Sequence, residues 1–310
     1  MPSRLAALAA KTTIREYAQG AAQEGVAPVA DFLAPTVEVA SPTGYYKVYS
    51  EKSRFRVPNT KRAIGGRATV LGFDASDATF NCAPHALDVP IDQVEGMADE
   101  SMEALLQEGA DMANEAASLA HEQTVIDTAI ATLTAGAGAI DFAADKDLVD
   151  QLDQQIIAII KAANYGSLMG IGLLFGPTFF RRFKNHPSVK GRFISGGKKE
   201  IVNPSIDDIL SLFIAKPEAQ LSMLVKDTAP EGKAASYDFL LDSNLIVFAR
   251  KQAPTRRDPS FMKTFRLKGA WMAPRVYTRD DGRVEVAAMD WSEQVNVTNS
   301  AAGKLLTISN

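Results

Sequence analysis

The sequence has 310 residues, of which 46% are hydrophobic and 23% are charged, and its formal net charge is -4. That length is sufficient to bury a sizeable core in one large or two interleaved domains. The small acidic net charge gives no general attraction for nucleic acid. A single cysteine, Cys82, excludes an intrachain disulfide and a cysteine-rich metal cluster. No signal-peptide core and no apolar run of about 18 residues occurs, so the sequence predicts a protein made in a reducing cytoplasm and not inserted in a membrane.

The first part of the chain predicts two projecting segments. Residues 1–35 are expected to form an N-terminal arm, because a short amphipathic stretch is followed by a Gly/Ala-rich connection. Residues 36–90 combine Tyr, Val and Phe with polar residues, which is typical of an extended β-hairpin loop with flanking strands. The tip is expected within residues 58–66, a stretch rich in turn residues, and the return limb is expected to end near Pro90.

A long helix is predicted next. Residues 99–133 contain no proline and are dominated by good helix formers. An apolar stripe with mostly i, i+3, i+4 spacing runs along them and comprises Met102, Leu105, Leu106, Ala113, Ala116, Leu119, Ala120 and Val125. A helix of roughly 50 Å with one modest stripe needs a neighbouring element to lie along.

The remainder of the chain indicates a mixed α+β domain without regular βαβ alternation. Helices are expected at 147–164, 177–183 and 206–213, and core strands at 168–175, 221–225 and 244–249. Beyond residue 265 the pattern is rich in strands, with a tight turn at Asp280-Asp281-Gly282 between strands 275–278 and 284–287.

Charge is strongly separated along the chain. Residues 44–67 carry seven basic side chains and one acidic one, whereas residues 68–145 carry fifteen acidic side chains and no lysine or arginine. Complementary surfaces in one chain favour a head-to-tail contact between copies, and such contacts close into rings or shells. The charge pattern leaves two alternatives open: two merely solvated faces, which is the commoner fate of charge runs, and a hairpin that binds nucleic acid.

The candidate contact residues follow from this separation. On the loop they are the basic residues Lys47, Lys52, Arg54, Arg56, Lys61, Arg62 and Arg67. On the long helix and the segment before it they are the acidic residues Asp92, Glu95, Asp99, Glu100, Glu103, Glu108, Asp111 and Glu115. We expect the loop of one copy to lie over the long helix of the next copy.

The sequence offers almost no candidate for catalysis. His121-Glu122 opens like a zincin helix, but Val125 stands where the second histidine ligand belongs. The sequence contains no phosphate-binding loop, dinucleotide fingerprint or nucleophile elbow, and Cys82 has no obvious histidine partner. The sequence therefore predicts no catalytic, cofactor-binding or metal-binding residues, and a protein that is not an enzyme.

The order and spacing of several segments resemble the Hong Kong 97-type major capsid proteins of tailed bacteriophages, from about residue 36 to the C-terminus. Residues 62–66, 76–82 and 86–90 are similar to the tip and return limb of that family's extended loop, and the acidic helix is similar to its spine helix. Residues 175–189, with the His186-Pro187 turn, and residues 244–249 are similar to its axial domain. Residues 259–265, 280–291 and 299–305 are similar to the return to its peripheral domain and to the closing strands.

The resemblance implies an α+β capsid fold divided into an N-terminal arm (1–35), an extended loop with flanking strands (36–90), a peripheral domain with the spine helix (91–140), an inserted axial domain (141–264) and closing peripheral strands (265–310). It implies a structural major capsid protein whose hexamers and pentamers form an icosahedral shell around double-stranded phage DNA, without sequence-specific DNA binding. The implied partners are other copies of the chain, a separate scaffolding protein, a portal and decoration proteins, but no membrane. The implied location is the virion capsid, after assembly in the host cytoplasm. An encapsulin-like cellular compartment and an oligomeric α+β enzyme with an unrecognised site remain alternatives.

Overall fold

The computed structural model describes residues 29–49, 59–70, 75–94, 101–162, 170–193, 204–230, 233–234, 236–251, 253–269 and 273–309. In chain order they form α2 (Val29–Leu33), β1 (Thr36–Val39), β2 (Thr43–Tyr49), β3 (Ala75–Asn81), β4 (Ala83–Asp92), α3 (Met102–Leu133), β5 (Gly138–Asp141), α4 (Leu148–Ala162), β6 (Gly170–Phe175), α5 (Pro177–Asn185), α6 (Pro187–Lys190), α7 (Ile206–Leu210), β7 (Glu218–Leu221), β8 (Val225–Asp227), β9 (Tyr237–Phe239), β10 (Asn244–Arg250), β11 (Met262–Leu267), β12 (Ala273–Thr278), β13 (Val284–Val297) and β14 (Gly303–Ser309). None of the helices in these ranges has the length and apolar composition needed to cross a membrane.

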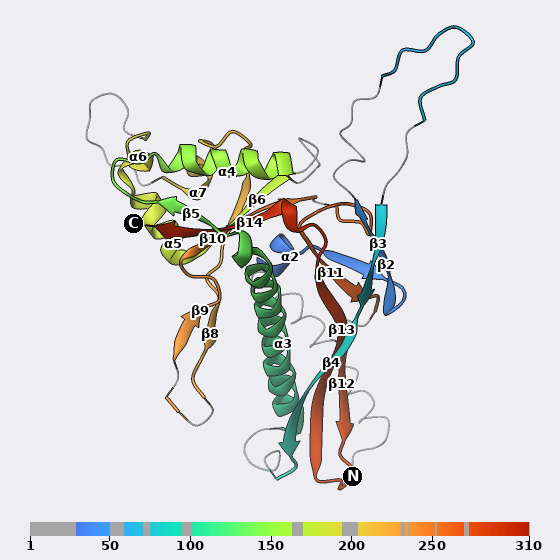
Figure 1. Ribbon diagram of the computed structural model, residues 1–310. Helices are drawn as coiled ribbons and strands as arrows, with labels where there is room; N and C mark the ends of the chain where they lie inside the picture. Colours follow the sequence, from blue (N-terminus) through green and yellow to red (C-terminus); the bar gives the residue numbers. More distant parts are fainter. Residues whose placement is uncertain are drawn as a thin grey trace.

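The first sheet is built around the 14-residue strand β13. β13 pairs antiparallel with β4, β11 and β12, and β1 runs parallel to β11. The long helix α3 lies along one face of this sheet (Figure 1). Because side chains alternate between faces along a strand, Ala287, Met289 and Trp291 all point toward α3 and pack against it. The long helix thus has the neighbour that its sequence requires.

Small residues hold α3 close to the sheet. Its buried face includes Gly109, Ala110, Ala113 and Ala117, and a Cβ added at Gly109 would lie only 3.3 Å from side-chain atoms of Ile91 and Val89. The sequence-based stripe was wrong at Ala116 and Ala120, which are exposed. Small side chains carry a weak hydrophobic signal, so periodicity alone misplaced part of this face.

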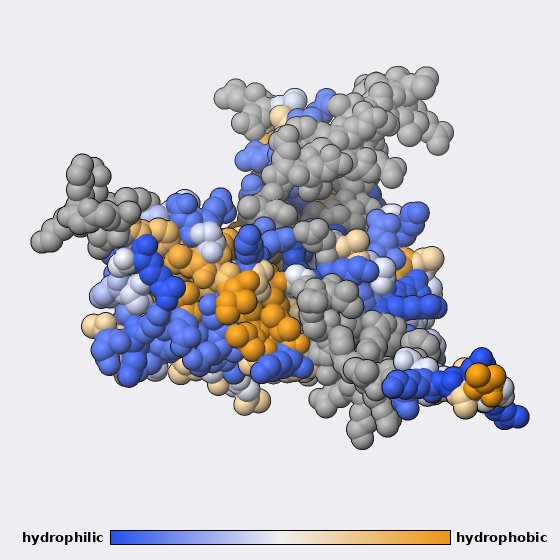
Figure 2. Space-filling view, turned by 90° about the horizontal axis from the view of Figure 1, so that it is seen from above, coloured by the Kyte–Doolittle hydropathy of each residue, from blue (hydrophilic) through white to orange (hydrophobic). Residues whose placement is uncertain are grey.

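The second sheet has the strand order β5-β14-β10-β6-β7. Helix α4 lies across it on one side, and the short helices α5, α6 and α7 surround its edges (Figure 1). The sheet core is continuous with the C-terminal part of α3 and with α2, so the two sheets share one large hydrophobic cluster. Seen from above, a hydrophobic patch lies where α4 runs (Figure 2), and Ile157 and Ala158 on this helix are exposed.

Three predicted boundaries need correction. The return limb of the loop ends at β3, because β4 (83–92) pairs along β13 in the first sheet. The apolar residues of the predicted arm within 29–34 (Val29, Ala30, Phe32, Leu33 and Ala34) are buried against the shared core. The last strand, β14, lies between β5 and β10 in the second sheet instead of closing the first. An alternating or apolar pattern identifies a strand, but it does not say which sheet the strand joins.

Other segments agree with the sequence-based expectations in kind, with shifts of a few residues at their ends. The expected strand at 221–225 is instead divided between β7 and β8. The inserted domain was predicted to span residues 141–264. The second sheet already starts with β5 at residue 138, and the chain returns to the first sheet with β11 at residue 262. β8 and β9 form a separate two-stranded ribbon that projects from the second sheet (Figure 1).

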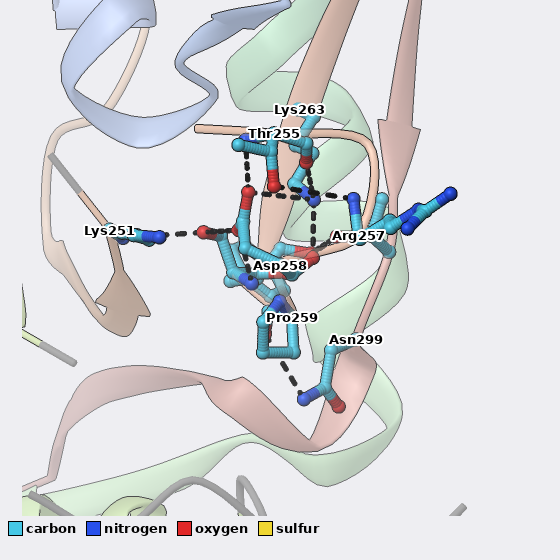
Figure 3. A network of polar contacts seen from close by, with 10 residues as sticks. Lys251, Thr255, Arg257, Asp258, Pro259, Lys263 and Asn299 are labelled. Atoms are coloured by element: carbon cyan, nitrogen blue, oxygen red, sulfur yellow. Dashed lines mark hydrogen bonds and ion pairs between the residues drawn. The ribbon is translucent and has the colours of Figure 1, made fainter. Parts of the chain in front are cut away.

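A buried polar network fixes the connection between the two sheets, where the chain passes from β10 to β11 (Figure 3). The Lys263 ammonium, at the start of β11, forms an ion pair with Asp258 at 3.2 Å and donates to the carbonyl oxygens of Thr255, at 2.7 Å, and Asp258. The Asp258 carboxylate also accepts hydrogen bonds from the backbone N–H and the hydroxyl of Ser260. Each polar group in this connection therefore fixes the position of another.

Burial and pairing act in opposite directions on this ion pair. Burial raises the pKa of Asp258, but the hydrogen bonds from Ser260 and Thr255 and the charge of Lys263 outweigh it, so the net shift is downward. Burial lowers the pKa of Lys263, and Asp258 offsets part of that shift. Because each charge is tolerated only beside the other, the pair should be sensitive to removal of one member.

Candidate assembly surfaces

The extended loop starts from a regular antiparallel ribbon. β2 and β3 pair from Thr43↔Asn81 to Tyr49↔Ala75, and Lys47 on β2 forms an exposed ion pair with Asp77 on β3 at 2.5 Å. Lys47 is thus already partnered within its own ribbon. Beyond the ribbon, the described tip (residues 59–70) projects away from α3 of the same chain (Figure 1).

The basic residues of the tip are accessible. Lys61, Arg62 and Arg67 are all exposed, and the Arg62 guanidinium donates a hydrogen bond to the Gly66 carbonyl oxygen at 3.2 Å. The other three predicted loop contacts, Lys52, Arg54 and Arg56, lie outside the described residues. The tip therefore presents at least three cations to solvent.

The predicted acidic contact residues of α3 lie mostly on its solvent side. Glu103, Glu108 and Glu115 are exposed, and Asp111 is half-buried. Asp92, at the end of β4, is exposed and accepts a hydrogen bond from the Val94 backbone N–H at 2.9 Å. The predicted contacts Glu95, Asp99 and Glu100 lie outside the described residues. Within the described ranges, no ion pair joins the loop to α3 of the same chain, so the two charged surfaces are displayed separately.

A charged cluster that no sequence pattern predicts lies between α3 and the first sheet. His121 Nδ1 lies 2.9 Å from Glu293 Oε1, and Arg266 Nη2 lies 3.3 Å from Glu293 Oε2. Burial raises the pKa of Glu293. The hydrogen bonds that Glu293 forms with His121 and Arg266, together with the charges of these two residues, outweigh burial, so the net shift of the pKa is downward. The three residues are distant in sequence, so only the polar His121-Glu122 step within an apolar helix face could have drawn attention to this place.

Glu122 connects α3 to α2. Its carboxyl accepts hydrogen bonds from the backbone N–H groups of Ala30 and Val29, where α2 begins. Burial raises the pKa of Glu122 from 4.5 to about 7, with a smaller increase from Asp31, while those hydrogen bonds and His121 act to lower it. At neutral pH this buried carboxyl is therefore held close to its titration midpoint.

We expect Glu122→Gln to stabilise the unassembled subunit by about 1–3 kcal/mol at pH 8 and to leave its stability near pH 4.5 almost unchanged. A carboxyl with a raised folded-state pKa contributes stability that is fully present below about pH 4.5 and is lost as the pH rises through about 7. Glutamine is uncharged at every pH, so the variant escapes this loss.

Urea unfolding of the wild type and of Glu122→Gln at several pH values measures the effect. Glu115→Gln, on the exposed side of the same helix, is the matched control and should follow the wild type. A Glu122→Gln subunit that is less stable than the wild type at pH 8 would contradict this account of Glu122.

A cleft of about 250 Å³ opens beside this cluster, at the edge where α3 parts from the first sheet. Its lining residues are Ala120, His121 and Thr124 from α3, together with Ala83, His85, Trp291, Glu293, Gln294 and Val295 from the sheet. His85 and Trp291 face each other across β4 and β13 and their rings stack, with centroids 5.3 Å apart. Aromatic and aliphatic walls with a few polar groups are typical of a site for an apolar side chain or ligand.

Chemistry-bearing residues do not otherwise converge in the described part of the chain. No group of three or more His, Cys, Asp or Glu side chains within these ranges is placed to hold a metal ion. Cys82 is buried, with its thiol 3.4 Å from the Phe265 carbonyl oxygen. Burial, reinforced by the charge of Glu293, raises the pKa of the Cys82 thiol, which disfavours the reactive thiolate.

Comparison with known proteins gives no match by sequence, either to a family profile or to a curated protein. Solved structures do match. A phage-related protein from Bordetella bronchiseptica is 17% identical with a TM-score of 0.67, and the alignment covers 96% of each chain. The mature capsid of bacteriophage PhiM1 is 12% identical with a TM-score of 0.56, over 89% of this chain and 84% of that chain. The holo-SrpI encapsulin complex from Synechococcus elongatus is 10% identical with a TM-score of 0.50, over 88% of this chain and 83% of that chain.

The chain has the Hong Kong 97-type fold. The expected α+β architecture is confirmed over nearly the whole chain, and α3 is the spine helix of that fold. The spine helix contains 32 residues and begins at Met102, where Ser101 caps it by accepting a hydrogen bond from the Ala104 backbone N–H. A shared fold does not by itself establish what the chain assembles into, so function must be argued from the surfaces.

Proposed function

We propose that the protein is a structural shell subunit and not an enzyme: the major capsid protein of a tailed bacteriophage, whose copies form hexamers and pentamers of an icosahedral head. One observation carries the proposal. The basic tip of the extended loop projects away from the spine helix of its own chain, and Glu103, Glu108 and Glu115 on that helix are exposed. A surface that makes no ion pair with the other among the described residues, yet is complementary to it in charge, favours a head-to-tail contact between copies.

The energetics of such a contact suit a shell. A single exposed ion pair contributes only about 0–1 kcal/mol. Lys61, Arg62 and Arg67 can each approach an acidic side chain of the neighbour, and every copy repeats the contact. Weak contacts allow wrongly placed subunits to dissociate, and a closed lattice of many such contacts is stable. The exposed hydrophobic surface on α4 adds a second region suited to contact between copies (Figure 2).

The architecture suggests how the parts are used. The first sheet with the spine helix corresponds to a peripheral domain, and the second sheet with α4 to α7 corresponds to an axial domain near a symmetry axis. We further propose a scaffolding protein, a portal and decoration proteins as partners, and a virion location. A net charge of -4 suits a container for double-stranded DNA, since a basic inner wall would bind the DNA and hinder packaging.

An encapsulin-like compartment is the second candidate, because an encapsulin complex shares the fold. The phage-related protein and the phage capsid have higher TM-scores with this chain than the encapsulin complex does. Both candidates share the fold and predict the same self-assembly, so the contents of the particles must distinguish them.

Negative-stain electron microscopy of the purified chain tests the proposal. We expect closed shells, tubes or capsomer rings, and no enzymatic turnover is required for their formation. A discrete small oligomer under all conditions would contradict a shell subunit. Within virion-like particles from the natural source, nuclease-protected double-stranded DNA supports the phage shell, whereas an enclosed protein cargo supports the compartment.

A further inference from the structure

The apex of the extended loop presents a hydrophobic side chain on an ordered turn. The Gly66 backbone N–H donates to the Ala63 carbonyl oxygen at 2.9 Å, and Gly65 has φ +81°. Ile64 has negative φ, and a bond between the first and fourth residues with positive φ only at the third is characteristic of a type II turn. Ile64 therefore occupies the second position, at the outermost point of the turn, where its side chain is 107% exposed.

Further contacts hold this apex in shape. The Lys61 backbone N–H donates to the Asn59 side-chain oxygen at 3.1 Å, and the Thr69 hydroxyl donates to the Asn59 carbonyl oxygen at 2.9 Å. Figure 2 shows hydrophobic surface at the projecting tip, flanked by hydrophilic surface. A large aliphatic side chain at the end of a projecting arm contributes no hydrophobic stabilisation to the isolated subunit. Such a side chain is typical of an anchor that becomes buried on binding.

The cleft between the spine helix and β13 has matching properties. A cavity of roughly 150 Å³ is enough to hold benzene, so a cleft of about 250 Å³ has room for an isoleucine side chain. Trp291, Ala120 and Val295 offer apolar contact surface on its walls. Asp127 lies three residues after Thr124, hence on the same side of the helix, and is exposed. Asp127 therefore adds one carboxylate beside the cleft, whereas the flanks of the tip are basic.

We propose that Ile64 of one copy inserts into the cleft between the spine helix and β13 of an adjacent copy, with Lys61 and Arg62 approaching Asp127 at its rim. This inference rests on the proposed shell function and identifies the anchor point of its loop contact. The occupant is a second copy because the tip projects away from the spine helix of its own chain (Figure 1) and because its charge complements the cleft rim. An apolar anchor within a polar rim is the usual anatomy of a protein interface.

Site-specific disulfide crosslinking tests the contact. In a Cys82→Ala background, Ile64→Cys combined with Thr124→Cys should give a ladder of linked subunits after mild oxidation of assembled particles. The matched control pairs Ile64→Cys with Met112→Cys, which is exposed on the same helix about 18 Å from Thr124. The control should give no ladder, and neither should the single-cysteine variants.

A second measurement separates the anchor from the wider charge contact. Ile64→Asp should raise the subunit concentration needed for assembly by at least about tenfold, whereas Ile64→Val should change it little. Both variants should unfold like the wild type, because Ile64 is fully exposed. Particles that form normally with Ile64→Asp, or that crosslink at Met112→Cys and not at Thr124→Cys, would overturn the anchor while leaving the shell function intact. Failure of the wild type to assemble at all would instead reject the shell function, and the anchor with it.

Discussion

Reversing the charge of the loop tip, with Lys61→Glu, Arg62→Glu and Arg67→Glu together, is expected to raise the concentration of subunit needed for assembly roughly 100-fold. Each substitution removes an attraction of up to about 1 kcal/mol and introduces a repulsion from the acidic spine of the adjacent copy. The three side chains are exposed and take no part in the core, so the free energy of unfolding of the isolated subunit should not change.

Sedimentation velocity at a series of concentrations measures this threshold, and circular dichroism verifies folding. A matched control reverses three exposed basic residues elsewhere, Lys233, Arg279 and Arg283, and should assemble at the wild-type concentration. High salt should weaken wild-type assembly in the same direction, because it screens exposed charges. If the tip variant and the wild type assembled at the same subunit concentration, the charges of the loop tip would not contribute to the contact between copies.

Compensation provides a sharper form of the same experiment. Glu115→Lys and Asp127→Lys reverse two exposed acidic residues of the spine helix within reach of the proposed anchor point. Combining these changes with the reversed tip in one chain restores complementary signs between loop and spine, so assembly should recover toward the wild-type threshold. Recovery of this kind is not expected if the two surfaces contact different partners.

Replacing the buried lysine by Lys263→Met is expected to destabilise the subunit by about 3–5 kcal/mol. Lys263 is fully buried, and its removal leaves the charged Asp258 carboxylate in a dry connection between the two sheets. It also leaves the carbonyl oxygen of Thr255 without the ammonium donor. A loss of this size is a large part of the total stability of a typical domain.

Urea unfolding measures this loss, with Asp258→Asn and the double variant completing a thermodynamic cycle. The double variant should recover part of the stability, because no unpaired charge then remains buried. Arg275→Met breaks an exposed ion pair with Asp290 at 3.2 Å and serves as control, with an expected loss below about 1 kcal/mol. A Lys263→Met subunit as stable as the control would show that the network at this connection contributes little.

Local patterns in the sequence located the long helix, the extended loop and most strands. Residues 102–133 combine good helix formers with an N-cap serine, Ser101, and local chemistry of this kind acts wherever the segment lies in the fold. The turn at Asp280-Asp281-Gly282 was found for the same reason, since Gly282 has φ +70° as the turn requires.

Assignment of strands to sheets was beyond such patterns. β14 reads as a strand, but its pairing with β5, 160 and more residues earlier in the chain, is set by packing against α4 and the shared core. The His121–Glu293–Arg266 cluster likewise joins residues from α3, β13 and β11. The contact surfaces could be predicted because charge segregation is visible in contiguous segments of the sequence. The cleft that receives the proposed anchor could not be predicted, because it forms only when α3 packs on the first sheet.

The most direct test of the account is a cryo-electron microscopy reconstruction of assembled particles at side-chain resolution. We predict that residues 59–70 of each subunit cross the spine helix of the adjacent subunit, with the basic tip facing Asp127. A loop that lies along the spine helix of its own chain, or a particle in which neighbouring copies meet without the loop, would contradict it.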